Sequence, residues 1–138
     1  MKKSTIIRSG RHCAFDLHVH LVFVTKYRRR VFNAEILNDL KEIFSDVCKD
    51  FDSKLIEFDG EKDHVHLLVN YQPKTSVSKL VNSLKGVSSR LIKKHHSQHI
   101  SQFLWKNSLW SPSYFAGSCG GAPIDIIKKY IEQQETPI

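Results

Sequence analysis

The feature that most constrains the fold is a period of two over positions 15–24, in which every second residue from Phe15 to Phe23 is apolar. Successive side chains of a β-strand point to opposite faces, so this period of two predicts a strand with one buried face. His18 and His20 fall on the opposite face of the same strand. The apolar positions are Phe15, Leu17, Val19, Leu21 and Phe23.

A second apolar run, over positions 64–69, carries another pair of alternating histidines. His64 and His66 are separated by Val65 and followed by Leu67. In a strand these two imidazoles stand on one face, with Cα atoms roughly 6.5 Å apart. That spacing lets both rings reach one divalent metal ion. It is equally compatible with two polar residues on an exposed face, and both interpretations stay open at this point.

Two segments have the 3- and 4-residue apolar spacing of amphipathic helices. The first is predicted to run from an N-cap at Asn33 to about Phe51, and its acidic residues lie largely off the apolar stripe. The second is predicted to start after Ser76, and it carries Lys85 and Arg90 beside its apolar side. The histidine-rich segment 95–99 that follows is predicted to be a solvated connection.

The remaining elements complete an alternating order. A short strand over Leu55–Phe58 turns into the His64 strand, and another is expected near Tyr114 and Phe115. Residues 122–135 form a last helix that begins near Pro123. The order β-α-β-β-α-β-α predicts an α+β fold, a mainly antiparallel, ferredoxin-like sheet with helices on one face. The other face stays open and carries the histidines.

Length and composition predict one domain over residues 1–138, with residues 1–12 as a basic arm. The net charge is +7 and is segregated: residues 1–30 carry eight Lys or Arg against one Asp, whereas residues 31–63 carry four against ten acids. Such segregation suits a polyanion on one side of the molecule. Charge that serves only solubility is the alternative.

The chain has no apolar run long enough to span a membrane and no signal-peptide core. Its three cysteines, Cys13, Cys48 and Cys119, are odd in number and far apart. A disulfide framework is therefore not expected, and the reducing cytoplasm is the predicted location.

The last predicted helix brings Tyr130 and Gln134, four residues apart, onto one face. Ile127 and Ile131 give this helix an apolar side for docking. The simple interpretation of Tyr130 is an amphipathic residue at a packing rim, and a functional role needs further support.

Several motifs, in order and spanning about Phe15 to Gln134, resemble one known family. Together they are similar to the single-tyrosine HUH transposases of small bacterial insertion sequences, the IS200-like transposase family. The motifs are Lys26-Tyr27-Arg28-Arg29, Asp63-His64-Val65-His66-Leu67-Leu68, Lys85-Gly86, Leu109-Trp110-Ser111-Pro112-Ser113-Tyr114 and Tyr130-Ile131-Glu132-Gln133-Gln134.

The resemblance implies a role for each matching residue. Tyr130 matches the nucleophile, and His64, His66 and Gln134 match the ligands of a Mg²⁺ or Mn²⁺ ion. It also implies the HUH nuclease fold and a homodimer in which Tyr130 completes the histidine pair of the partner subunit, with Gly120-Gly121 as a hinge. His18 and His20 lie outside the HUH position and are assigned to sheet packing or substrate contact.

The implied activity is cleavage and rejoining of single-stranded DNA at hairpin-flanked element ends, through a 5′-phosphotyrosine intermediate. The residues expected to hold the DNA backbone are Lys26, Arg28, Arg29, Arg30, Lys85 and Arg90. Two alternatives stay open: a domesticated, repeat-associated HUH nuclease and a non-catalytic module that binds single strands. Such modules place stacking aromatics on the open sheet face, where this chain has histidines.

Overall fold

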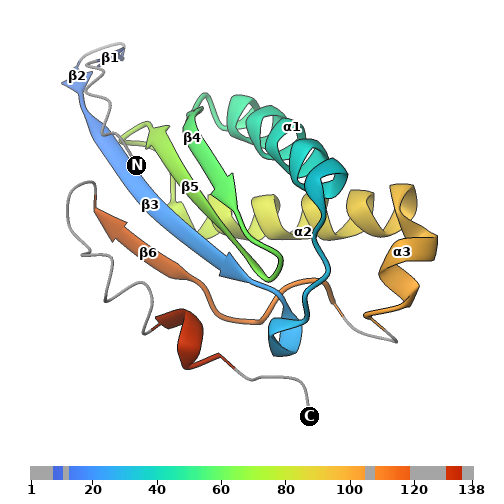
Figure 1. Cartoon of the computed structure of the whole chain (residues 1–138). Helices are drawn as coiled ribbons and strands as arrows, with labels where there is room; N and C mark the ends of the chain where they lie inside the picture. Colours follow the sequence, from blue (N-terminus) through green and yellow to red (C-terminus); the bar gives the residue numbers. More distant parts are fainter. Residues whose placement is uncertain (1–7, 11–12, 105–107, 119–129, 135–138) are drawn as a thin grey trace.

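The computed structural model describes residues 8–10, 13–104, 108–118 and 130–134 (Figure 1). Its main body is a four-stranded sheet with two long helices on one side. The sheet strands are β3 (Leu17–Val24), β4 (Lys54–Gly60), β5 (His64–Tyr71) and β6 (Phe115–Ser118), and the helices are α1 (Ala34–Asp50), α2 (Val77–His95) and α3 (Ser97–Ser101). The predicted α+β class, with an antiparallel sheet and helices on one face, is confirmed.

The sheet has the strand order β4-β5-β3-β6, and each neighbouring pair is antiparallel. Val22 on β3 lies opposite His66 on β5 and opposite Phe115 on β6. Val24 lies opposite His64. Residues directly opposite one another in a ladder point to the same face. Both histidines therefore share the face that α1 and α2 leave uncovered.

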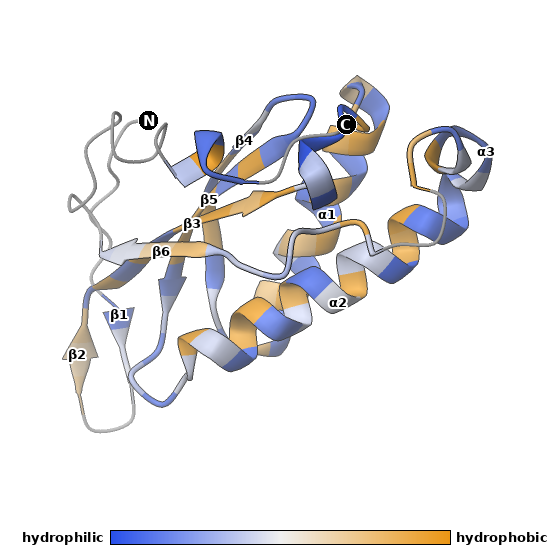
Figure 2. Cartoon of the chain, turned by 90° about the horizontal axis from the view of Figure 1, so that it is seen from below, coloured by the Kyte–Doolittle hydropathy of each residue, from blue (hydrophilic) through white to orange (hydrophobic). Residues whose placement is uncertain are grey.

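The core lies between the other sheet face and the two helices. Figure 2 shows apolar residues recurring along α2, as the 3- and 4-residue spacing predicts. Phe23 from β3 packs edge-on against Phe44 of α1 and against Trp110, with ring centroids 5.9 and 5.7 Å apart. Val19, Leu21 and Phe23 are buried as expected, whereas Leu17 is partly exposed and Phe15 lies in a separate short strand, Ala14–Phe15.

Both predicted helix starts are confirmed at the level of the cap. The Asn33 side chain accepts a hydrogen bond from the Ile36 amide, and the Ser76 hydroxyl accepts one from the Lys79 amide. Each cap satisfies one of the backbone donors that a helix N-terminus leaves without a partner. The first helix ends at Asp50, one residue from the predicted end.

Two expectations for the connections were wrong. Part of the predicted arm is a short hairpin, because β1 (Arg8–Ser9) pairs with β2 (Ala14–Phe15). The 95–99 connection is not simply solvated: it begins α3, where the His96 ring bonds Asp39 at 2.6 Å and the His99 ring bonds the Val31 carbonyl at 2.7 Å. The two histidine contacts join residues 57 and 68 positions apart, which local patterning does not encode.

The structure covers the last predicted helix only in part. Residues 130–132 are helical, whereas residues 122–129, residue 135 and the Gly120-Gly121 hinge lie outside the described residues. The same holds for residues 1–7, 11 and 12 of the basic arm. The division of the chain into arm, body and terminal helix stays a prediction. Across the described ranges, every helix is too short or too polar to cross a bilayer.

Candidate active site

Three imidazoles gather on the open face of the sheet. His64 and His66 come from β5, with ring centroids 5.0 Å apart, and His20 comes from β3, with its centroid 5.5 Å from that of His66. All three side chains are partly exposed. The prediction that His64 and His66 share one face is therefore met by the strand register.

Asp63 fixes the orientation of the His64 ring. The His64 Nδ1 and Asp63 Oδ1 atoms are 2.8 Å apart, and the Arg28 Nε atom lies 3.5 Å from the other carboxylate oxygen. The hydrogen bond to His64 is the main reason why the pKa of Asp63 is lowered. A carboxylate only accepts, so Nδ1 carries the proton and the Nε2 lone pair is left available to a ligand.

His66 is the most strongly perturbed of the three imidazoles. Its Nδ1 atom lies 3.4 Å from Nε2 of His20. Burial lowers the pKa of His66 to about 4, with further lowering from the neighbouring His64 and His20. The ring is therefore neutral near pH 7, which is the form that binds metal ions. Burial also lowers the pKa of His20.

Residues 130–134, called here the C-terminal turn, lie on the same sheet face. Its Ile131 packs on Val22 and Val24, and the Tyr130 ring lies 5.9 Å from that of Phe115 on β6. Because Val22 and Val24 lie opposite His66 and His64, the turn covers the strand next to the histidine pair. Figure 1 shows this turn near the β6 edge of the sheet.

The polar groups of this turn are held by two serines of the segment that precedes β6. The Tyr130 hydroxyl lies 2.8 Å from Ser113 Oγ, and Gln134 Oε1 accepts hydrogen bonds of 3.1 Å from both Ser111 and Ser113. Burial raises the pKa of Tyr130, and the hydrogen bond with Ser113 opposes that rise. The structure therefore brings Tyr130 and Gln134 together.

The histidine pair and the tyrosine–glutamine pair lie on one sheet face, but the first belongs to β5 and the second to the C-terminal turn. The Ser111 amide donates to the Val24 carbonyl, and Val24 lies opposite His64. Two inter-strand spacings, about 10 Å, thus separate the backbone of Ser111 from that of His64. Within the described ranges, no group of three or more His, Cys, Asp or Glu residues is placed to hold a metal ion.

The donor chemistry at the histidine pair suits a divalent cation. Two imidazoles, together with a carboxamide oxygen, form a mixed nitrogen–oxygen donor set. Gln134 is within the same surface but is bonded to the serines here. Its role as a third ligand stays a prediction.

The basic residues expected to bind DNA have different surroundings. Arg29 donates to the Phe103 carbonyl, Lys85 donates to the carbonyls of Ser111 and Ser113, and Arg28 pairs with Asp63. Lys26 lies over the Tyr27 ring, 5.5 Å from its centroid. Arg30 and Arg90 are exposed. Three of the six therefore also hold parts of the protein together.

His18 does not join the site. It is buried, its Nδ1 atom lies 3.0 Å from Asp16 Oδ1, and its Nε2 atom lies 3.3 Å from the Asn70 amide nitrogen. Asn70 in turn accepts a hydrogen bond of 2.6 Å from Arg8. The sheet-packing assignment for His18 agrees with these contacts.

Sequence reasoning gave no role to Ser111, Ser113 or Asp63. The carboxylate of Asp63 directly precedes the histidine pair, so its position was a usable signal. The serines belong to the Trp110-Ser111-Pro112-Ser113 segment, but their contacts with residues 130 and 134 are too distant in sequence for any local pattern to reveal.

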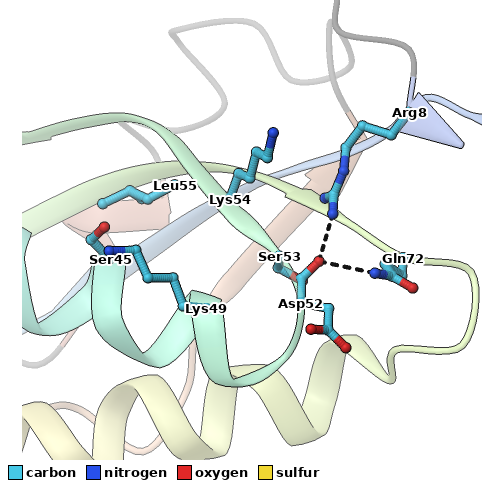
Figure 3. A pocket seen from close by; sticks show the side chains of 8 residues that line it. All are labelled: Arg8, Ser45, Lys49, Asp52, Ser53, Lys54, Leu55 and Gln72. Atoms are coloured by element: carbon cyan, nitrogen blue, oxygen red, sulfur yellow. Dashed lines mark hydrogen bonds between the residues drawn. The ribbon is translucent and has the colours of Figure 1, made fainter. Parts of the chain in front are cut away.

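A separate hollow of about 520 Å³ lies at the end of α1, outside the candidate site (Figure 3). Figure 3 shows Arg8 and Gln72 pointing at the Asp52 carbonyl, which accepts hydrogen bonds of 2.8 and 3.2 Å from them. None of the predicted site residues lines this hollow.

An open sheet face with paired imidazoles, a tyrosine and flanking cations defines a class of nucleic-acid-processing protein. The chain matches the family Transposase IS200 like over residues 13–134, and it belongs to that family. It is 33% identical over 128 residues to the ISDra2 transposase TnpA of Deinococcus radiodurans, covering 93% of this chain and 91% of that one. It is 29% identical to the transposase for insertion sequence element IS200 of Salmonella typhimurium, covering 92% and 82%.

Solved structures show the same fold. A transposase from Deinococcus radiodurans R1 superposes with a TM-score of 0.83 at 31% identity, covering 94% of this chain and 99% of that chain. A REP-associated tyrosine transposase bound to a REP hairpin gives a TM-score of 0.55 at 12% identity, covering 96% and 67%, and shows the fold alone. Family membership makes DNA transposition the process in which this protein acts.

Proposed function

We propose that this protein cuts and rejoins single-stranded DNA at the hairpin-flanked ends of an insertion sequence, with Tyr130 as the nucleophile. The observation that supports this most is that Tyr130, Gln134, His64 and His66 all belong to one open sheet face. The family membership supports the coarser conclusion of transposition.

In the proposed reaction the Tyr130 oxygen attacks the phosphorus of a phosphodiester in line with the 3′ oxygen. The new bond joins the phenol oxygen to phosphorus while the bond from phosphorus to the 3′ oxygen breaks. The phenol proton is lost and the 3′ oxygen gains one, giving a free 3′-OH and a 5′-phosphotyrosine. Because the bond energy is retained, a second 3′-OH can reverse the step without a nucleotide cofactor.

His64, His66 and Gln134 are the residues that would hold a Mg²⁺ or Mn²⁺ ion. Such an ion supplies charge neutralisation and orientation at a scissile phosphate. Asp63 keeps the His64 ring in the tautomer that leaves Nε2 free. Gln134 has to exchange its two serine partners for this position, so we propose that the Gln134 side chain turns away from the serines before cleavage while Tyr130 stays at Ser113.

The proposed partners are single-stranded DNA hairpins and a second copy of the chain, with active sites shared between subunits. Arg30 and Arg90 are exposed, and we propose that they contact the DNA backbone. In such a dimer, the tyrosine that attacks DNA bound at one histidine pair comes from the same subunit or from its partner.

The test is covalent capture of DNA by the tyrosine. The protein is incubated with Mn²⁺ and a pool of labelled single-stranded hairpins with randomised flanks, and adducts are separated on a denaturing gel. We expect an adduct for the wild type and none for Tyr130→Phe, because the phenylalanine ring lacks the attacking oxygen. His64→Ala and His66→Ala are expected to lower adduct yield at least a hundredfold.

Three results would contradict this proposal. An undiminished adduct in Tyr130→Phe moves the nucleophile to another residue, Tyr114 and Tyr27 being the next candidates. Tight hairpin binding by the wild type without any adduct, in Mg²⁺ as in Mn²⁺, makes the protein a non-catalytic binding module. Cleavage restricted to repeat hairpins that do not flank the element favours the domesticated nuclease.

A further inference from the structure

One hydroxyl group lies between the two functional groups of the C-terminal turn. Ser113 Oγ is 2.8 Å from the Tyr130 hydroxyl and 3.1 Å from Gln134 Oε1. The carboxamide oxygen only accepts, so Ser113 donates its single proton to Gln134. The Tyr130 hydroxyl must then be the donor to Ser113. The three groups form one directional chain, from tyrosine to serine to glutamine.

Ser111 supports the glutamine end of this chain. Its hydroxyl also donates to Gln134 Oε1, at 3.1 Å, and its side chain is largely buried. The Gln134 amide nitrogen donates back to the Tyr130 carbonyl at 3.1 Å. The carboxamide is therefore held on both its oxygen and its nitrogen.

Lys85 on α2 holds the two serines in place. Its ammonium group donates to the Ser111 carbonyl at 2.7 Å and to the Ser113 carbonyl at 3.1 Å. The side chain is half-buried, and burial lowers the pKa of this lysine. A charged donor bonded to two carbonyls makes a stronger link than neutral pairs do. These contacts account for Lys85 without any contact with DNA.

The serine segment is also fixed to the sheet and the core. The Ser111 amide bonds the Val24 carbonyl at 2.8 Å, and the Lys26 amide bonds the Leu109 carbonyl at 3.0 Å. The Trp110 indole donates to the Ser88 hydroxyl at 2.9 Å. A segment with this many anchors is rigid enough to define where a hydrogen-bonded partner lies.

We propose that Ser113 is a positioning residue for the nucleophile Tyr130, and that Lys85 acts through it by fixing the Ser111–Ser113 segment. This inference rests on the proposed function of Tyr130. When Gln134 leaves the serines, the Ser113 proton is free to turn to the tyrosine oxygen. The same hydroxyl then orients Tyr130 while it attacks.

The first experiment compares three variants in single-turnover adduct formation at saturating DNA. Ser113→Ala is expected to slow the rate about tenfold, the value of one orienting hydrogen bond. Its Kd for the hairpin, measured by fluorescence anisotropy, stays within about twofold of the wild type. Ser113→Thr keeps the hydroxyl and restores the rate. Ser101→Ala removes a comparable exposed hydroxyl from α3 and is the matched control.

The second experiment separates the two roles of Lys85. Lys85→Met keeps the length of the side chain and removes its charge. We expect a rate loss close to that of Ser113→Ala, no further loss in the double variant, and an unchanged hairpin Kd. A raised Kd with an unchanged rate makes Lys85 a DNA contact and overturns its positioning role.

Three outcomes overturn the role of Ser113. They are a Ser113→Ala rate equal to that of the wild type, a Ser113→Thr rate as low as that of Ser113→Ala, and a faster rate in Ser113→Ala, which makes the serine an inhibitory latch. Tyr130→Phe distinguishes this result from failure of the proposed function, since loss of the tyrosine abolishes the adduct whatever the serine does.

Discussion

His66 is the residue whose ionisation is most affected by the fold. Its imidazole lies on a sheet face where burial and two other histidines disfavour a positive charge. The pKa of about 4 is below that of an unfolded histidine, about 6.5. The native state therefore resists protonation at a pH where the unfolded chain accepts it.

This difference predicts a loss of stability in mild acid. Above about pH 6.5 both states hold a neutral His66, and no penalty exists. As the pH falls from about 6.5 to about 4, only the unfolded state takes the proton, so the free energy of unfolding decreases by about 1–2 kcal/mol after allowing for solvent screening. Urea unfolding in the presence of EDTA at pH 7.5, 6.0 and 5.0 measures this decrease in the free energy of unfolding.

His66→Gln, which cannot titrate, isolates the contribution of this side chain. The stability of the wild type relative to His66→Gln should be highest at pH 7.5 and decline toward pH 5.0. His95→Gln is the control, because His95 is exposed at the end of α2. A wild-type advantage that is constant with pH would contradict the shifted pKa.

At this scale the sequence revealed the histidines but not their partners. The period-two spacing of His64 and His66 was enough to place both rings on one face. The contacts of Gln134 with Ser111 and Ser113 join residues at least 21 positions apart. Only the packing of the C-terminal turn on Val22 and Val24 creates them.

Among the elements, two glycines illustrate opposite constraints. Gly60 ends β4, where an added Cβ would lie 2.7 Å from Leu37 Cδ2 of α1 and 3.1 Å from Val65 Cγ1. Gly86 lies in the middle of α2 on its solvent-exposed side, where an added Cβ would meet nothing within 4 Å. The first is required by close packing, whereas the second only weakens its helix.

Alanine at these two positions should therefore change stability in opposite directions. Gly60→Ala is expected to lower the free energy of unfolding by about 1 kcal/mol, because the Leu37 side chain must leave its position and Val65 must give way slightly. Gly86→Ala is expected to raise it by up to about 1 kcal/mol through helix propensity. Urea denaturation of both variants measures the two changes. Equal stabilities for Gly60→Ala and the wild type would show that the Leu37 and Val65 side chains move aside without a cost in stability.

The elements with strong local signals were predictable, and features too short to show a repeating pattern were not. Asn33 and Ser76 marked both long helices because a side-chain cap is a local property. The β1–β2 hairpin involves pairs of two residues each, too short to show a period. The same limit applies to the register shift between Leu55 and Glu57 on β4.

On the scale of the whole molecule, the positive charge divides into structural and available cations. Arg29 and Lys85 bond backbone carbonyls, whereas Arg30 and Arg90 are exposed. Sequence counting treats these four residues alike. Only the structure separates those that fasten segments of the chain from those free to meet a polyanion.

This division predicts how salt should affect binding. Arg30→Ala and Arg90→Ala should each reduce the slope of log K against log salt by about 0.7 for a single-stranded ligand, with an unchanged melting temperature. Arg29→Met should instead lower the melting temperature, since it breaks the link to Phe103. Anisotropy titrations from 50 to 300 mM salt, with thermal melts, are the measurements. Identical slopes for wild type and Arg30→Ala remove Arg30 from the interface.

The packing of Ile131 on Val22 and Val24 determines how much free energy is needed to move Tyr130 away from the sheet. The two valines are fully buried although they belong to the open face, and Ile131 is only 9% exposed. Uncovering one such aliphatic side chain costs roughly 2 kcal/mol. Moving Tyr130 away uncovers three such side chains and breaks the serine hydrogen bonds as well, so far fewer than one per cent of molecules hold Tyr130 away from the sheet at equilibrium. The two valines therefore stay out of water in nearly all molecules, and any process that draws Tyr130 away has to replace this apolar cover.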